Sequence, residues 1–179
     1  LESEDVIFSF DPPQKCDSVK SKKQNSYCVK TVQPLQNQIL IHYLKSRKLN
    51  IEICKMYLDE VYYTINQKKY FGVGFKNDKN QYEIRNKYAK LCLGEKWFTW
   101  INRSNKSLVV LESWSDFLSL LSLYPKCEKS KDFLILNSLS MLSKVDNVLN
   151  MYAELLFALD NDVAGSNATE NCLKEWNLG

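Results

Sequence analysis

The spacing of apolar residues indicates helices first, then antiparallel strands, and finally alternating strands and helices along the 179-residue chain. Apolar side chains recur every three and four residues after Pro34, which suits a first helical position, so we expect a helix there. A second short helix is expected from Ile51 to about Glu60. Residues 1–33 show little periodicity apart from a short strand expected at residues 6–8, which is typical of a linker or of a segment wrapped over the surface.

Aromatic and β-branched residues dominate the next stretch and favour strands. Residues 61–65 and 70–75 form two such runs, and the polar residues between them predict a hairpin. Residues 82–85 and 97–101 are expected to continue a largely antiparallel sheet. The first part of the chain is therefore predicted to be an α+β lobe that covers residues 34–104.

Strand-then-helix units follow a polar loop at residues 102–106. We expect strands at residues 108–111, 133–136 and 155–159, and helices at residues 114–124, at residues 138–151 and from about residue 163. This order predicts a parallel sheet with helices on its faces. The predicted fold class is α/β, with the N-terminal α+β lobe followed by a second lobe, residues 105–179, that is built on a mainly parallel sheet.

Acidic residues follow two of the predicted parallel strands. Glu112 ends the first strand, and Asp160 and Asp162 follow the third. Because the carboxyl ends of parallel strands share one edge of a sheet, we expect these three side chains to converge. Carboxylate oxygens suit a hard cation such as Mg²⁺ or Mn²⁺. Together with a carboxylate that shuttles a proton, such a centre is suited to phosphoryl transfer. Asp116 lies one turn into the next helix, on the same side as Glu112.

A purely structural interpretation exists for each of these carboxylates. Asp160 and Asp162, at a strand-to-helix turn, also fit a solvated turn and a helix N-cap. Glu112 and Asp116 likewise fit the capping of the helix that follows them. The residues alone leave both interpretations open.

Composition narrows the classes of protein to consider. A net charge of +3, 45% hydrophobic residues and 25% charged residues are ordinary for a globular protein and permit a phosphate-bearing partner. No apolar run is long enough to span a membrane, and the first residues do not resemble a secretion signal. The six cysteines are widely spaced and His42 is the single histidine, which argues against a zinc site in this chain. We expect reduced core cysteines and a cytoplasmic location.

Basic side chains are interleaved with aromatic ones in the predicted antiparallel sheet: Lys76, Arg85, Lys87 and Lys90 with Tyr82 and Tyr88. Grooves that bind single-stranded nucleic acid use this combination. An ordinary solvated sheet face explains the same pattern.

Two motifs of the second lobe resemble those of Toprim domains, the metal-binding fold shared by bacterial primases, topoisomerases and some nucleases. Residues 112–116 (ESWSD) resemble the motif E-G-x-x-D, and residues 160–165 (DNDVAG) resemble D-x-D-x-A-G. Upstream, residues 70–77 (YFGVGFKN) and 82–88 (YEIRNKY) resemble the lobe that precedes Toprim in primase-like proteins, most of all those of Bacteroides mobile elements and plasmids. The resemblance covers about residues 38–173 and implies a Rossmann-like Toprim lobe.

The resemblance also implies a role for each candidate residue. Glu112 would be the general acid/base and a metal neighbour, and Asp160 and Asp162 would bind Mg²⁺ or Mn²⁺. Asp116 would support this centre as a second catalytic residue. Phosphates of the template or of nucleotides would be bound by the basic residues Lys76, Arg85, Lys87 and Lys90.

The sequence departs from the family pattern in several places. Ser113 replaces the usual motif glycine, and Asn80 and Gln81 stand where relatives commonly have two glycines. The zinc-binding module usual in primases is not found. The chain stops at Gly179, so we expect a second lobe that is truncated at its C-terminal end.

These features predict a primase-like nucleotidyltransferase core that acts on single-stranded DNA in the replication or mobilisation of a mobile element. Nucleotides and single-stranded DNA are its expected partners, a replicative helicase is a further one to consider, and no membrane is expected. Two alternatives are a non-catalytic nucleic-acid-binding Toprim module and a Toprim nuclease. A topoisomerase is disfavoured, because that reaction needs a separate domain that carries a tyrosine.

Overall fold

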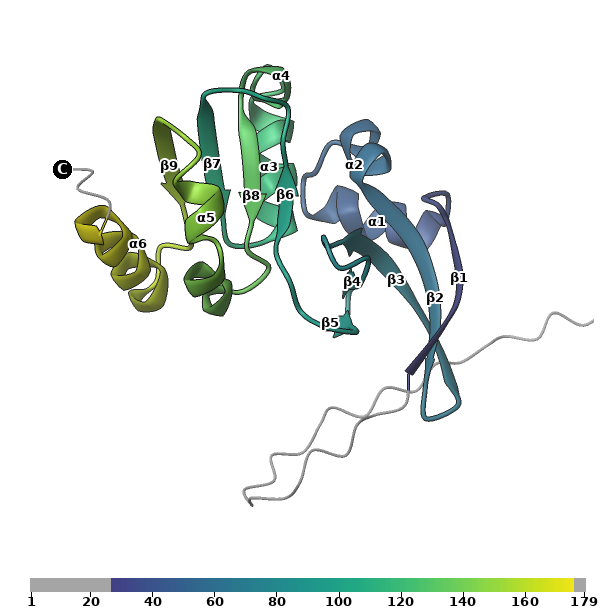
Figure 1. Cartoon of the computed structure of the whole chain (residues 1–179). Coiled ribbons are helices and arrows are strands. Elements are labelled where there is room, and N and C mark those ends of the chain that lie inside the picture. Colours follow the sequence, from purple (N-terminus) through teal and green to yellow (C-terminus); the bar gives the residue numbers. More distant parts are fainter. Residues whose placement is uncertain (1–26, 176–179) are drawn as a thin grey trace, which may run out of the picture.

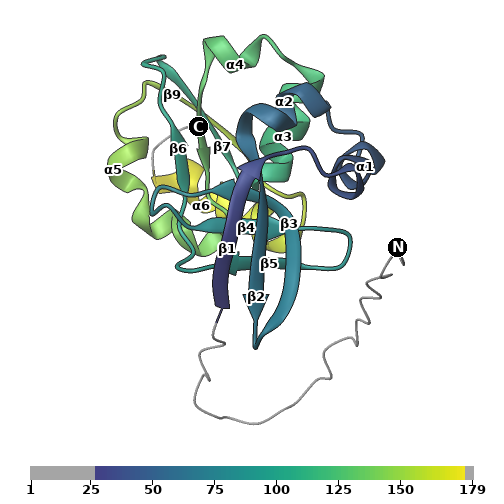
Figure 2. The ribbon, with the colours of Figure 1, turned by 90° about the vertical axis from the view of Figure 1, so that its right-hand side faces the viewer.

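The computed structural model describes residues 27–175, which form two lobes, each built around one sheet (Figure 1). The strand expected at residues 6–8 lies outside the described residues. The first lobe contains a five-stranded antiparallel sheet in the order β1-β2-β3-β4-β5. Its elements are β1 (Tyr27–Pro34), α1 (Gln38–Ser46), α2 (Ile51–Tyr57), β2 (Leu58–Ile65), β3 (Lys68–Lys76), β4 (Tyr82–Arg85) and β5 (Lys90–Leu93). Figure 2 looks onto this sheet, with α1 and α2 near one end of its strands.

The β2–β3 hairpin was predicted, and its loop is shorter than expected. Only Asn66 and Gln67 separate the strands, and both have positive φ, 48° and 69°. Positive φ at both central residues is the conformation that matches the right-handed twist of the flanking strands. Lys68 and Lys69 already belong to β3, where they pair with Ile65 and Thr64.

The beginning of the first lobe differs from the prediction. Residues 27–34 form strand β1, whereas the sequence indicated a linker followed by a helix from Pro34. The helix α1 starts at Gln38, and the Asn37 side chain caps it by accepting a hydrogen bond from the Ile39 N–H at 2.9 Å. β1 pairs only with β2 and all of its residues are exposed, so it lacks the apolar alternation by which a strand is recognised. Helix α2 also ends three residues early, because Leu58–Glu60 join β2.

The second lobe contains a four-stranded sheet in the order β6-β8-β7-β9. β7 pairs in parallel with both β8 and β9, as expected for strand-then-helix units. The expected α/β fold class is confirmed. The elements are β6 (Thr99–Ile101), β7 (Ser107–Leu111), α3 (Trp114–Leu123), α4 (Cys127–Ser130), β8 (Asp132–Ile135), the 3₁₀ helix η1 (Leu139–Lys144), α5 (Asp146–Leu149), β9 (Glu154–Ala158) and α6 (Val163–Glu175).

Three details of the second lobe correct the prediction. The strand expected at residues 97–101 belongs to this sheet, as β6, and pairs antiparallel with β8. The single helix expected at residues 138–151 is divided into η1 and α5, with the fully buried Val145 at the break. β9 is an edge strand rather than a buried one, and Leu156 is 59% exposed.

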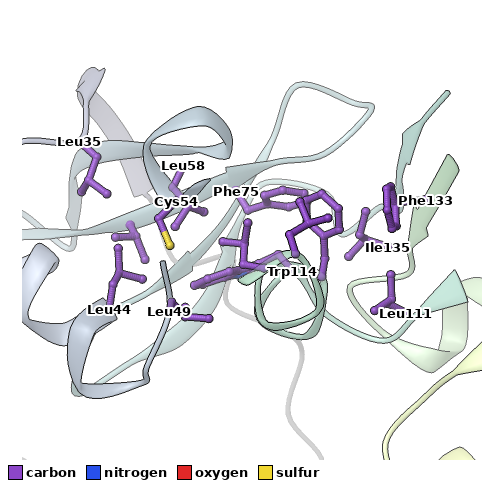
Figure 3. Packing of buried hydrophobic residues seen from close by; sticks show 14 of the residues in the cluster. Leu35, Leu44, Leu49, Cys54, Leu58, Phe75, Leu111, Trp114, Phe133 and Ile135 are labelled. Carbon is purple, nitrogen blue, oxygen red and sulfur yellow. The ribbon is translucent and has the colours of Figure 1, made fainter. Parts of the chain in front are cut away.

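One hydrophobic core joins the two lobes. It contains residues of α1 and α2, the side of β2 and β3 that faces them, helix α3, and one face of β7 and β8. Figure 3 shows this cluster running from Leu35 and Leu44 in the first lobe to Phe133 and Ile135 in the second. The opposite face of the second sheet packs against η1 and α5, and the opposite face of the first sheet has a smaller core of its own. The shared core fixes how the carboxyl edge of the second sheet faces the first lobe.

Candidate acidic centre and inter-lobe hollow

Glu112, Asp160 and Asp162 lie at the carboxyl edge of the second sheet, as the strand order requires. β7 and β9 are neighbours, and Leu111 pairs with Ala158 at their ends (Figure 1). Glu112 follows Leu111 directly and is half-buried, whereas Asp160 and Asp162 are exposed. The three carboxylates therefore come from two adjacent strand ends.

Electrostatic coupling within this group is visible in the pKa of Glu112. Burial raises the pKa of the Glu112 carboxyl, the charge of Asp160 raises it further, and Asp162 and Asp116 add to the effect. A hydrogen bond from the Asp160 backbone N–H opposes this rise. The Glu112 Oε2 atom is buried and has no hydrogen-bond partner. A half-buried carboxyl with a raised pKa and a free oxygen is equipped to take up or release a proton.

The turn between β9 and α6 holds Asp162 by hydrogen bonds from backbone N–H groups. The Gly165 N–H donates to Asp162 Oδ1 at 2.8 Å, and the Ser166 N–H donates to the Asp162 carbonyl at 2.9 Å. A Cβ added at Gly165 would lie 2.0 Å from the Asp160 carbonyl oxygen. Asp162 is thus an N-cap of α6, as the structural interpretation held.

The donor chemistry fits a hard divalent cation, although the side chains are not gathered around one. Within residues 27–175, no three Asp, Glu, Cys or His side chains are arranged to hold a metal ion together. Carboxylate oxygens from Glu112, Asp160 and Asp162 are the ligand type that Mg²⁺ and Mn²⁺ prefer, and the unpartnered Glu112 oxygen is buried beside them. The carboxylates repel one another, and this repulsion contributes to the raised pKa of Glu112. A bound cation would remove the repulsion.

Asp116 lies beside this centre and caps helix α3. Its Oδ2 accepts hydrogen bonds from the Ser113 N–H at 3.0 Å and from the Ser113 hydroxyl at 2.6 Å. Ser113 has φ −138° and ψ 161°, an extended conformation open to any residue, so the site does not require glycine here. Asn80, which stands where relatives commonly have glycine, is also accommodated. Its φ is 58°, a left-handed conformation that asparagine tolerates.

The predicted basic residues do not form one cluster. Arg85 and Lys90 are paired across β4 and β5, and both line a hollow between the two lobes. Lys87 lies in the turn between these strands, with its Nζ 5.7 Å from the centre of the Tyr88 ring. Lys76 is exposed at the end of β3, where it pairs with Tyr82, the first residue of β4. Of these four, Arg85 and Lys90 line the hollow together with residues of the second lobe.

The hollow between the lobes collects unpartnered polar atoms. Its empty volume is about 200 Å³, part of it open to solvent, and it is lined by Glu83, Ile84, Arg85, Lys90, Ser113, Trp114 and Asn137. Among the described residues, five buried side-chain atoms lack a hydrogen-bond partner: Glu83 Oε1, Arg85 Nε, Glu112 Oε2, Trp114 Nε1 and Asn137 Oδ1. Four of these atoms belong to residues that line the hollow. The fifth belongs to Glu112, which immediately precedes the lining residue Ser113. Buried polar atoms are rarely left unpaired, so this grouping marks a place where polar partners are needed.

Glu83, Trp114 and Asn137 were not predicted from the sequence. Asn137 follows β8, so the rule that identified Glu112 and Asp160 would also have found it. Glu83 lies two residues before Arg85 on β4, hence on the same face of the strand. Trp114 could not be recognised as part of a polar site, because a tryptophan at this position is typical of a core side chain.

Comparisons with known proteins match the two lobes separately. Residues 29–94 match a family described as a domain of unknown function, DUF8464, and residues 109–178 match a family described as Toprim-like. No curated protein matches the chain. Among solved structures, the chain is similar to a primase domain in the structure of bacteriophage T7 lagging-strand DNA polymerase interacting with primase domains of two gp4 subunits bound to an RNA/DNA hybrid and dTTP.

That similarity has a TM-score of 0.51 and 14% sequence identity, and it covers 87% of this chain and 79% of the T7 chain. At such low identity it concerns the fold, and it extends over both lobes. The Toprim-like match begins in β7 and includes Glu112, Asp160 and Asp162. The second lobe is therefore similar in sequence to the Toprim-like family, and the chain as a whole resembles a primase domain in fold.

Proposed function

We propose that this chain is a primase-like nucleotidyltransferase core that joins nucleotides on a single-stranded DNA template. The observation that carries the proposal is the convergence of Glu112 with Asp160 and Asp162 at one sheet edge, expressed in the raised pKa of Glu112. The Toprim-like match and the likeness in fold to a primase domain support it. The lobes expected for this core were residues 34–104 and 105–179; by sheet membership, the first lobe runs from β1 to β5 and the second begins at β6.

Each group of residues has a part in the proposed reaction. Asp160 and Asp162, with Glu112 beside them, would hold Mg²⁺ or Mn²⁺, which when bound neutralises phosphate charge during transfer. The Glu112 carboxylate, whose buried Oε2 has no hydrogen-bond partner, would accept the proton of the attacking hydroxyl. Arg85 and Lys90 line the hollow together with Ser113, the residue after Glu112, and would bind the phosphates of the nucleotide. Lys76 and Lys87, both exposed, contact the phosphates of the template.

The cellular setting follows from the same proposal. We place the protein in the cytoplasm, in the replication or mobilisation of a mobile element, with a replicative helicase as a partner. Within the described residues, no helix is long and apolar enough to cross a membrane.

A non-catalytic module that binds nucleic acid is the second candidate. The observation in its favour is that Asp162 and Asp116 are both engaged in helix capping, the role that the structural interpretation assigns to them. In such a module the acidic edge would only terminate helices α3 and α6, and the basic residues of the first lobe would bind nucleic acid without metal.

Manganese binding tests the proposal most directly. In an EPR titration, we expect the wild type to bind Mn²⁺. The double variant Asp160→Asn/Asp162→Asn should lose most of that binding, because two charged carboxylates are replaced by neutral amides. Asp146→Asn, which removes an exposed carboxylate from α5, is the matched control and should bind like the wild type.

Primer synthesis on single-stranded DNA then separates the candidates. Incorporation of nucleotides that disappears in Asp160→Asn supports the proposal, and Glu112→Gln should reduce it as well. DNA binding that persists without metal, together with no incorporation, would instead support the module. Cleavage of the single strand would indicate a nuclease. If wild type and double variant bind the same small amount of Mn²⁺, the catalytic proposal is wrong.

A further inference from the structure

A chain of hydrogen bonds crosses from the first lobe to the acidic centre. Arg85 Nη1, on β4, donates to the Ser115 hydroxyl at 2.9 Å. The Ser115 and Ser113 hydroxyl oxygens are 2.8 Å apart, and the Ser113 hydroxyl donates to Asp116 Oδ2 at 2.6 Å. Four side chains thus link a sheet strand of one lobe to the first turn of α3 in the other.

The two serines in the middle of this chain of hydrogen bonds are shielded from solvent. Ser113 is 8% exposed and Ser115 is 4% exposed. The Arg85 guanidinium lies 5.2 Å from the centre of the Trp114 ring, and Trp114 itself is fully buried. Hydrogen bonds of charged groups strengthen where water is excluded, so this arrangement holds the start of α3 in one orientation relative to the first lobe.

Helix capping alone does not require these contacts. The Ser113 N–H already donates to Asp116 Oδ2 at 3.0 Å, which completes a cap within α3. Arg85 and the Ser115 hydroxyl add nothing to that cap. They do add a connection between lobes, at the residue that follows Glu112. A glycine at position 113 would have no hydroxyl, so this link depends on the serine that departs from the Toprim motif.

We propose that Arg85, Ser115 and Ser113 are positioning residues, which hold Glu112 toward Asp160 and Asp162 by fixing the start of α3. The proposal rests on the proposed function, because it concerns the same acidic centre. Glu112 is joined directly to Ser113, so a rotation of the first turn of α3 moves its carboxylate. A ligand that is oriented in advance loses less freedom when a cation binds, hence the chain of hydrogen bonds strengthens binding without touching the cation.

The test removes single hydroxyl groups and measures Mn²⁺ affinity by EPR titration of the whole chain. Ser115→Ala separates Arg85 from Ser113, and Ser113→Ala breaks the chain of hydrogen bonds while keeping the backbone N–H that donates to Asp116. Ser119→Ala is the matched control. Its hydroxyl donates to the Ser115 carbonyl at 2.8 Å on the same helix, outside the chain of hydrogen bonds.

We expect Ser115→Ala and Ser113→Ala to weaken Mn²⁺ binding roughly 3- to 10-fold, the effect of losing one partly charge-assisted hydrogen bond. Ser119→Ala should bind like the wild type. Arg85→Gln combined with Ser115→Ala should weaken binding no more than Arg85→Gln alone, since both remove the same link. Circular dichroism of each variant verifies that the protein is folded.

The outcomes distinguish this inference from the proposed function. Equal Mn²⁺ affinity in Ser115→Ala and Ser119→Ala, with a wild type that binds, overturns the positioning role and leaves the proposed function standing. A wild type that binds no Mn²⁺ overturns the proposed function, and the positioning role with it. Additive effects of Arg85→Gln and Ser115→Ala would show that the two residues act separately, contrary to the proposal.

Discussion

Single residues at the acidic edge differ in how strictly the backbone specifies them. Ser113 replaces a motif glycine in an extended conformation, so its side chain is accommodated and takes part in hydrogen bonds. Gly165 is different, because the Asp160 carbonyl oxygen occupies the space that a Cβ needs. The backbone therefore requires glycine at position 165 and does not require it at position 113.

We expect Gly165→Ala to destabilise the protein by about 1–3 kcal/mol, because a Cβ only 2.0 Å from a backbone oxygen forces the β9–α6 turn apart. Alanine in a helix normally stabilises by about 1 kcal/mol relative to glycine, so the predicted sign is the reverse of the usual one. Urea unfolding measures the change. Ser166→Ala, at the next and exposed position, should change the stability by less than about 0.5 kcal/mol, and a more stable Gly165→Ala variant would contradict the prediction.

At the scale of elements, strong periodicity was predictive and weak periodicity was not. The strands β7, β8 and β9 and the helix α3 were predicted within one or two residues, because each has a distinct apolar run or stripe. β1 was missed because its residues are all exposed, and the helix at residues 138–151 was wrong because tertiary packing divides it. Elements whose form depends on what they pack against need the fold to be known.

The ends of the second sheet depend on the fully buried Asp132 at the start of β8. Its Oδ1 accepts hydrogen bonds from the Arg103 N–H at 3.0 Å and the Asn105 N–H at 3.2 Å, and its Oδ2 accepts from the Tyr152 hydroxyl at 2.7 Å. Burial alone would raise the pKa of the Asp132 carboxyl, but hydrogen bonds from Tyr152, Asn105 and Arg103 outweigh it and lower that pKa. Asp132 thus ties the segment before β7 and the segment before β9 to β8.

We expect Asp132→Asn to destabilise the protein by about 2–4 kcal/mol at pH 7, because an amide cannot accept all of these donors. Because the pKa of Asp132 is lower in the folded protein than its ordinary value of 3.8, the ionised carboxylate stabilises the fold at pH values above 3.8. This stability is lost as the pH falls through the folded-state pKa of Asp132. The difference between wild type and Asp132→Asn should therefore shrink on acidification below about pH 4. Urea unfolding at several pH values measures it, with the exposed Asp146→Asn as control, and a difference that stays constant down to pH 2 would contradict the role of Asp132.

At the scale of the whole molecule, the two lobes are held by one core rather than by a hinge. Phe117 on α3 is fully buried, and its ring contacts Tyr57 and Phe75 of the first lobe and Phe133 of the second, at centroid distances of 4.9, 6.2 and 5.0 Å. The acidic edge therefore keeps a fixed relation to β4 and β5. This relation allows residues of the first lobe to support a site in the second.

We expect the lobes to unfold together, and Phe117→Ala to destabilise both by about 3–5 kcal/mol through the cavity it leaves. Hydrogen exchange with increasing urea, followed on peptides from β2–β3 and from β7–β8, should show coincident transitions that shift together. Leu156→Ala removes a side chain that is 59% exposed and should cost less than about 1 kcal/mol. Two separate transitions in the wild type would show that the shared core does not couple the lobes.

The amino-acid pattern alone was enough to predict the α/β class, the hairpin, the strand-then-helix units and the placement of Glu112, Asp160 and Asp162 at one sheet edge. These follow from local periodicity and from the rule that parallel strands end at a common edge, so they need no knowledge of distant contacts. Tertiary structure decided the sheet to which residues 99–101 belong and the approach of Arg85 to Ser115, which lie 30 positions apart. It also gathered Glu83 and Asn137 at the hollow. Such contacts depend on how two sheets pack across a shared core, and no periodicity along the chain encodes that packing.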